Sequence, residues 1–524
     1  MTRAATEGGP YKTDMRLLSA FIAFALAAPL SLGGADEPTK ELAKLEKQLK
    51  AAHANVGPAI ACVVVSRSDK YPKPAKRLEP GRLGGFDRDA FLKAEPGKAR
   101  LADRLDLSNP ETIPDHGFAG GIVIDSAGLV LTNYHTIDGA TKIYVHIPGG
   151  TGSYADLHAA DARSDLAVLK LLTPPADMKP VRFGKVRLPD FADDAKANVF
   201  PGKLALAMAF PYRSGAVMDR PTAGLGHIAK VRFPTTDPNR NMYSIYNYAP
   251  LLEFDSHFNP GVSGAALLNL DGDVIGLTTA TATLPSNEHS DALPTDENLT
   301  RIIEVLRRGE EVEYGFLGVS GPTRDPFGRN VPKRGRGIPI VSPPTPGSPA
   351  ALAKLMHQDL ITHINDHPVG AFEDLLHHIG SGLAGRKIKL RVERANRTLP
   401  EIEIALAKFK NEMPYLATVR PEPAFGLRVD YASVILPTLI NPFGGRNANE
   451  IPNGVYVREL VPDSPAAAKF KALGESNRWI VSHVNGVAVF KPADFYKEAK
   501  GQKAVTLTVF DPTDGMGRRE ITLP

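Results

Sequence analysis

Residues 259–267 read NPGVSGAAL, and the apolar stretch DVIGL follows at residues 273–277. The segment sets Ser263 between Gly261 and Gly264, in a tight turn that opens onto a strand. Glycine allows a chain to bend sharply and allows another chain to approach closely. The backbone N–H groups of Gly261 and Ser263 can then converge on one carbonyl oxygen, which is the arrangement of a serine nucleophile beside an oxyanion hole. The stretch therefore predicts a nucleophile that needs a base and an orienting carboxylate elsewhere in the chain.

Both partners occur upstream of the serine. Residues 131–137, LTNYHTI, place His135 directly after an apolar strand, and residues 164–170, SDLAVLK, place Asp165 directly before another. A histidine can take the serine proton and return it to the leaving amine, while an aspartate fixes the tautomer of the imidazole and stabilises the imidazolium. The order along the chain is His, Asp, Ser, which is the order of the chymotrypsin-like enzymes.

These segments, with the hairpin sequence GGIVIDSAGLVLT at residues 120–132, resemble those of one protease family. From about residue 59 to the C-terminus, with long insertions, the chain resembles the HtrA/Deg family of trypsin-like serine proteases with two C-terminal PDZ domains. The resemblance implies a mainly β protein: a chymotrypsin-like double β-barrel protease domain followed by two α+β PDZ domains. It also implies that His135 and Asp165 come from the first barrel and Ser263 from the second, and that the chain forms homo-oligomers, as trimers or multiples of trimers.

The serine turn departs from the family pattern at two places. Val262 stands where the family usually has Asn, and Ala265 with Ala266 replaces the usual Gly-Pro pair. Valine is stiff, and alanine has a narrower range of backbone conformations than glycine. Two interpretations stay open: an active protease, or a chain whose oxyanion hole is misaligned and whose activity is weak, conditional or absent.

The resemblance also suggests the residues of the substrate pocket. His257 and Phe258 precede the nucleophile turn where trypsin-like enzymes line the primary specificity pocket, and Leu277, Thr278 and Thr279 are the candidate wall. A trypsin-type preference for basic side chains needs a carboxylate there. Because none is present, we expect a preference for small or medium apolar side chains.

Composition excludes several other functions. The 524 residues carry a formal net charge of only +4, and no basic run is interleaved with aromatic residues, so nucleic-acid binding is not indicated. The single cysteine, Cys62, lies in an apolar run typical of a buried strand, which favours a core thiol. No H-E-x-x-H motif, cysteine cluster or glycine-rich phosphate loop occurs, so we expect no metal and no cofactor.

The N-terminus resembles an export signal. Arg16 precedes an uncharged apolar stretch at residues 17–32, and small residues follow before Asp36. This pattern predicts a signal segment at residues 1–35, with an uncleaved membrane anchor as the alternative. Export of a chain that lacks disulfides favours the periplasm or cell envelope of a bacterium.

The rest of the chain divides into three predicted domains: the protease domain at residues 36–310 with an expanded loop at residues 67–115, PDZ domain 1 at 314–410, and PDZ domain 2 at 420–524. A diverged repeat supports the last two, because the SPAA sequence that begins at Ser348 recurs at Ser464. In PDZ domains, a backbone loop captures a peptide carboxylate while the peptide adds a strand to the sheet. The residues expected in these loops are Phe316, Leu317, Gly318 and Val319 in the first copy, and Phe425, Gly426 and Leu427 in the second.

Together these features predict an exported, ATP-independent serine endopeptidase that cleaves unfolded or damaged envelope proteins with a Ser-His-Asp triad. The PDZ copies would bind peptide C-termini or extended segments, or would gate the protease. The alternative is a catalytically weak or inactive PDZ scaffold or chaperone, which the variant turn at Val262 and Ala265 favours and the intact triad opposes.

Overall fold

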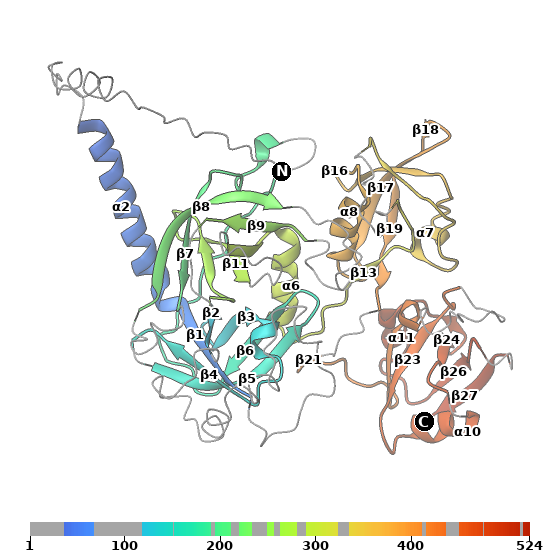
Figure 1. The fold of residues 1–524 in the computed structure, drawn as a ribbon. Helices are drawn as coiled ribbons and strands as arrows, with labels where there is room; N and C mark the ends of the chain where they lie inside the picture. The colour runs from blue at the N-terminus through green and yellow to red at the C-terminus, as the bar shows by residue number, and fades with distance from the viewer. Residues whose placement is uncertain are drawn as a thin grey trace, which may run out of the picture. The chain divides into compact units, whose positions relative to one another are not determined.

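The computed structural model (Figure 1) describes residues 36–67, 118–149, 151–189, 194–210, 220–232, 249–255, 262–279, 290–322, 335–410, 416–435, 450–474, 476–513 and 517–524. The predicted signal segment, and all of the expanded loop except Arg67, lie outside these residues. The chain falls into two units, 1–50 and 51–524. The described part of the first unit, residues 36–50, forms the start of helix α2 (Asp36–Val56). No helix in the described part of the chain has the length and apolar character needed to cross a membrane.

The first of two barrels is a closed ring of six antiparallel strands in the order β5-β4-β1-β2-β3-β6, in which β6 pairs back with β5 (Figure 1). A short strand, β21, adds to its outside at β5. Alternating small and branched side chains, among them Val63, Val130 and Leu169, fill the interior. Cys62 is fully buried in β1, and burial raises the pKa of its thiol, as expected of a core residue. The strands of this sheet are β1 (Ile60–Ser66), β2 (Phe118–Asp125), β3 (Leu129–Asn133), β4 (Lys142–Ile147), β5 (Thr151–Asp161), β6 (Leu166–Leu171) and β21 (Leu416–Ala417).

The second barrel is also closed, in the order β10-β11-β12-β9-β8-β7. Helix α6 (Glu297–Arg307) follows it. Its N-cap is Asp296, whose carboxylate accepts a hydrogen bond from the Leu299 N–H. The two closed barrels confirm the predicted double-barrel fold. The strands of the second are β7 (Leu204–Ala209), β8 (Thr222–Arg232), β9 (Leu251–Phe254), β10 (Ala266–Leu268), β11 (Val274–Thr279) and β12 (Ser290–Pro294).

Two α+β regions follow α6, each with its own apolar core. In the first, an α-helical turn, α8 (Phe372–Leu375), continues as a π-helical turn, η6 (Leu376–Gly380). Its other elements are β13 (Gly315–Phe316), β14 (Ile338–Pro339), α7 (Pro349–Leu352), β15 (Leu360–Ile364), β16 (His367–Pro368), β17 (Lys387–Arg394), β18 (Arg397–Thr398), β19 (Ile402–Ala405) and β20 (Ala407–Lys408).

The second α+β region repeats this plan of strands and two helices. Its sheet runs in the order β22-β23-β24-β26-β27, with β25 paired to β24. The elements are β22 (Leu427–Tyr431), η7 (Ala432–Ile435), β23 (Val455–Leu460), α10 (Pro465–Leu473), β24 (Ile480–Val484), β25 (Val487–Ala488), α11 (Pro492–Ala499), β26 (Val505–Phe510) and β27 (Arg519–Leu523).

The repeated serines act alike in the two regions. Ser348 and Ser464 are the N-caps of α7 and α10, and each accepts a hydrogen bond from a backbone N–H three residues on. Each also fills the space where a Cβ would stand on a loop glycine: the Ser348 Cβ lies 2.2 Å from that position on Gly318, and the Ser464 Oγ lies 2.4 Å from it on Gly426. Both glycines have positive φ, so only glycine fits these positions.

Candidate active site

The strand ends of the first barrel bring His135 and Asp165 together. His135 follows β3 on the single-turn helix α5 (Tyr134–Ile137), and Asp165 immediately precedes β6, which is the neighbour of β3. The His135 Nδ1 lies 2.7 Å from the Asp165 Oδ2. The His135 backbone N–H donates to the other carboxylate oxygen at 2.9 Å. Only 8% of His135 and 1% of Asp165 is exposed, so the pair interacts in a dry, low-dielectric setting.

Asp165 has a left-handed backbone conformation, with φ of 56°. Such a conformation is uncommon outside glycine, and a non-glycine residue holds it only where its surroundings fix it. Here the Asp165 carbonyl accepts hydrogen bonds from the Tyr134 N–H at 2.9 Å and from the Asn133 amide at 3.1 Å. The turn is thus tied at its backbone to the residues that lead into His135.

Ser263 lies in the turn that precedes β10 of the second barrel. Its carbonyl accepts a hydrogen bond from the Gly120 N–H of β2 at 2.7 Å, and the Gly120 carbonyl accepts one from the Thr132 hydroxyl at 2.8 Å. Thr132 comes three residues before His135, so the serine turn is joined to the strands that present the histidine. Within the described residues no hydrogen bond links the Ser263 hydroxyl to the His135 ring. Such bonds are often long or loose in unliganded proteases.

Close backbone approach explains the glycines of this turn. A Cβ on Gly264, whose φ is 84°, would lie 2.4 Å from the Gly120 carbonyl oxygen. A Cβ on Gly120 would lie 2.6 Å from the Ala265 backbone nitrogen. Ala265 itself is fully buried and is absent from the described residues with positive φ, so its methyl group fits the turn without backbone strain.

Two threonines at the end of β11 form hydrogen bonds to the serine turn and to Asp165. The Thr278 hydroxyl donates to the Val262 carbonyl and accepts from the Ala265 N–H at 2.9 Å, which fixes the serine turn. The Thr279 hydroxyl donates to the Asp165 Oδ2 at 3.3 Å. Sequence reasoning placed both residues, with the fully buried Leu277, in a pocket wall and missed these roles. A pocket wall at this position stays a prediction.

Other predicted site residues are only partly described. The pocket residues His257 and Phe258, and the oxyanion-hole residue Gly261, lie outside the described part of the chain. In the carboxylate loops, Leu317 and Leu427 are buried in their domain cores. In the first loop, Phe316 pairs with β20 and Val319 packs against the core. In the second, Phe425 has a left-handed backbone, with φ of 54°.

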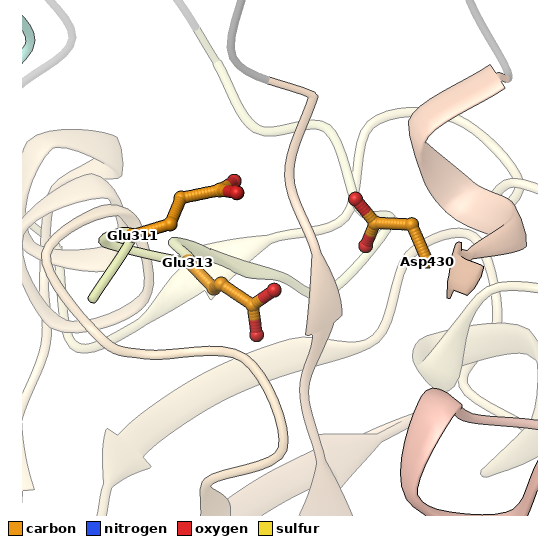
Figure 2. Close-up of side chains that lie close together, drawn as sticks. All are labelled: Glu311, Glu313 and Asp430. Atoms are coloured by element: carbon orange, nitrogen blue, oxygen red, sulfur yellow. The ribbon is translucent and has the colours of Figure 1, made fainter. Parts of the chain in front are cut away.

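Among the described residues, one group of carboxylates is close enough to suggest a metal site: Glu311, Glu313 and Asp430 (Figure 2). The Lys408 Nζ, however, lies 2.7, 3.0 and 2.8 Å from these three carboxylates in turn. Burial alone would lower the pKa of Lys408, but Asp430, Glu313 and Glu311 together raise it well above its ordinary value. The ammonium group therefore fills the position that a cation would take, and we interpret the cluster as an ion-pair network.

Replacing Lys408 with methionine should destabilise this region by about 3 kcal/mol, because the buried Asp430 carboxylate would keep only the more distant Arg458 guanidinium as a counter-charge. Trp479, the only tryptophan, lies in the core of the last domain and gives a local fluorescence signal for urea unfolding. The matched control is Lys387→Met, which removes an exposed ion pair with Glu403 and should leave the urea unfolding midpoint unchanged. Equal effects of the two substitutions would contradict the assignment.

Comparison with known proteins shows similarity to a trypsin-like peptidase domain and to a PDZ domain. A trypsin-like peptidase domain model matches residues 119–277, which contain His135, Asp165 and Ser263, and a PDZ domain model matches residues 315–406. The periplasmic pH-dependent serine endoprotease DegQ of Escherichia coli is 30% identical over 308 residues, which is 57% of this chain and 62% of DegQ. The chain thus spans a little under two thirds of that relative.

A second relative matches along nearly its whole length. A probable periplasmic serine endoprotease, DegP-like, from Brucella melitensis is 27% identical over 517 residues, which is 94% of this chain and 93% of the relative. Among solved structures, one of the HtrA-type protease AlgW with a decapeptide is 20% identical, covers 71% of this chain and 98% of its own, and superimposes with a TM-score of 0.43.

Proposed function

We propose that the chain, which is similar to trypsin-like serine proteases of the HtrA/Deg type, is an exported serine endopeptidase of the bacterial periplasm or envelope. Its substrates would be unfolded or damaged proteins, cleaved without ATP. The observation that carries the proposal is the buried contact of 2.7 Å between the His135 Nδ1 and the Asp165 Oδ2, beside a serine turn bonded to the same barrel.

In the proposed mechanism, Ser263 Oγ attacks the scissile carbonyl and His135 takes its proton. Asp165 holds the His135 tautomer with Nδ1 protonated and stabilises the imidazolium as charge develops. His135 then gives the proton to the leaving amine, and water releases the acyl group by the same steps in reverse. The N–H groups of Gly261 and Ser263 would bind the oxyanion.

The two α+β regions would act as PDZ domains that bind peptide C-termini or extended segments, or that gate the protease. Support comes from the paired loops around Gly318 and Gly426, where a capping serine occupies the space of the missing glycine side chain in the same way in both copies. We also propose, from the resemblance to HtrA/Deg proteases, that the chain assembles as a homo-oligomer, as trimers or multiples of trimers.

A second candidate is a PDZ scaffold or chaperone with weak or no catalysis. One observation favours it: within the described residues no hydrogen bond joins Ser263 to His135. The residue before this serine is Val262, where the family pattern has Asn. The ordinary backbone of Ala265 and the intact His135–Asp165 pair favour the protease.

Labelling with a fluorophosphonate probe separates the two candidates. We expect the full chain to be labelled at Ser263, located by peptide mass mapping, and to degrade unfolded casein. The variant His135→Ala keeps the serine but lacks the base, so it should lose the label. Failure of the unmodified chain to react, with and without added peptides as activators, would establish the scaffold instead.

A further inference from the structure

Asp165 lies at the end of the loop between β5 and β6. The Asp161 side chain, at the start of this loop, fixes the loop conformation. Asp161, the last residue of β5, accepts a hydrogen bond from the Ser164 N–H at 2.7 Å, and Ser164 directly precedes Asp165. Asp161 is 4% exposed and Ser164 is fully buried. A shift of the Asp161 carboxylate would therefore move the residue next to the left-handed Asp165.

The same carboxylate is also bonded from the PDZ side of the chain. The Tyr314 hydroxyl donates to the Asp161 Oδ2, and Tyr314, which is 1% exposed, directly precedes the residues that the PDZ model matches. Burial raises the pKa of Asp161, while its bonds from Tyr314 and Ser164 oppose that shift. One buried carboxyl thus connects Tyr314 with the turn that carries Asp165.

Arg163, two residues before Asp165, makes a second connection. Its guanidinium carbon lies 4.1 Å from the centre of the Tyr314 ring and 4.8 Å from that of Phe409. One of its N–H groups donates to the Gly380 carbonyl at 3.1 Å, where η6 ends. Carbonyls at a helix end lack intrahelical partners and attract cations, and a buried guanidinium between aromatic faces is held firmly.

The segment that follows the PDZ domain pairs with β5 beside Asp161. In β21, Leu416 pairs with Ala160 and Ala417 pairs with Ala159, immediately before Asp161 in β5. The Thr418 N–H continues this ladder to the His158 carbonyl at 3.2 Å. Both ends of the PDZ domain are therefore attached at the strand end that holds Asp161.

We propose that Asp161 and Arg163 are positioning residues through which the PDZ domain, by way of Tyr314, holds Asp165 in its catalytic orientation. The proposal rests on the proposed protease function. Neither residue touches the serine or the substrate in this arrangement; both act through the conformation of the loop between β5 and β6.

The variant Tyr314→Phe tests the link, because it removes one hydroxyl and keeps the ring beside Arg163. We expect kcat for an unfolded substrate to fall about tenfold with KM little changed, since misplacement of a catalytic group affects the chemical step. Asp161→Asn, which keeps an acceptor oxygen, should retain more activity than Asp161→Ala. The control is Tyr496→Phe, whose hydroxyl bonds the Val429 N–H in the last domain, and it should match the unmodified chain.

A second readout does not require turnover. In protein with isotopically labelled histidine, the His135 ring signals, assigned by their loss in His135→Ala, should shift in Tyr314→Phe and stay in place in Tyr496→Phe. Unchanged kcat and unchanged His135 signals in Tyr314→Phe would overturn the proposal. The proposal would fail in the same way if this variant were less stable but kept its kcat and its His135 signals. If the unmodified chain does not hydrolyse peptides, the protease function fails, and the His135 signals alone decide whether Tyr314 positions the pair.

Discussion

Replacing Ser263 with alanine should lower kcat for cleavage of an unfolded protein by about 10⁶-fold, because the chain would lose its only nucleophile for the acyl transfer. The substitution removes one oxygen and leaves the backbone contact between the Gly120 N–H and the Ser263 carbonyl. Folding and peptide binding should therefore persist. Initial rates with a quenched fluorescent casein, together with the unfolding midpoint, measure the two effects separately.

The matched control for this variant is Ser153→Ala. Ser153 is buried in β5, where its hydroxyl donates to the Tyr154 carbonyl and accepts from the Thr173 N–H at 2.9 Å. Its loss should reduce stability by about 1 kcal/mol and leave kcat within about twofold of the unmodified chain. Substantial proteolysis by Ser263→Ala would show that another group is the nucleophile, or that a contaminating protease cleaves the casein.

The sequence predicted the parts of the fold and site that local patterns encode. The apolar runs before His135 and after Asp165 are β3 and β6, and their pairing as neighbours explains why two residues thirty positions apart meet. The glycine after the serine was expected to permit close approach of another backbone segment. That segment is β2, which approaches at Gly120. The short apolar runs separated by turn residues indicated the strands, the resemblance to trypsin-like proteases implied two barrels, and the strand order confirms both.

The contacts that sequence reasoning missed join residues far apart in the chain. Thr279 bonds Asp165 across 114 positions, and Tyr314 bonds Asp161 across 153. Nothing in the local sequence of a threonine at a strand end, or of a tyrosine before a glycine, indicates such a partner. Only the closure of the second barrel, and the return of the chain at β21, bring these groups together.

The variant turn illustrates a second limit of sequence reasoning. Replacement of glycine by alanine at position 265 narrows the backbone range, and from sequence this counted against an aligned oxyanion hole. In the structure, Gly120 supplies the space that the Ala265 methyl group needs, and Thr278 binds the turn from the other side. Whether a substitution strains a turn depends on the residue packed against it, and here that residue lies in the other barrel.

The substitution Asp165→Asn should lower kcat by about 10⁴-fold with little change in overall shape. Asp165 accepts three hydrogen bonds: from the His135 N–H, from the His135 ring and from the Thr279 hydroxyl. An amide offers one oxygen and one N–H₂ group, so at least one of these donors would face another donor. The His135 ring would then take the tautomer whose Nε2 carries the proton, and could not accept the proton of Ser263. Steady-state rates on a fluorogenic peptide measure the loss.

Asp138→Asn provides the matched comparison for this last variant. Asp138 follows α5 and accepts a hydrogen bond from the Tyr134 hydroxyl at 3.1 Å, so the same isosteric change occurs close to His135 without touching its ring. We expect kcat within about threefold of the unmodified chain, because the asparagine amide oxygen can still accept the hydrogen bond from the Tyr134 hydroxyl. If Asp165→Asn and Asp138→Asn lose activity equally, Asp165 is not the residue that orients the imidazole. A loss confined to Asp165→Asn, with His135 still present, separates orientation of the base from its mere proximity to the serine.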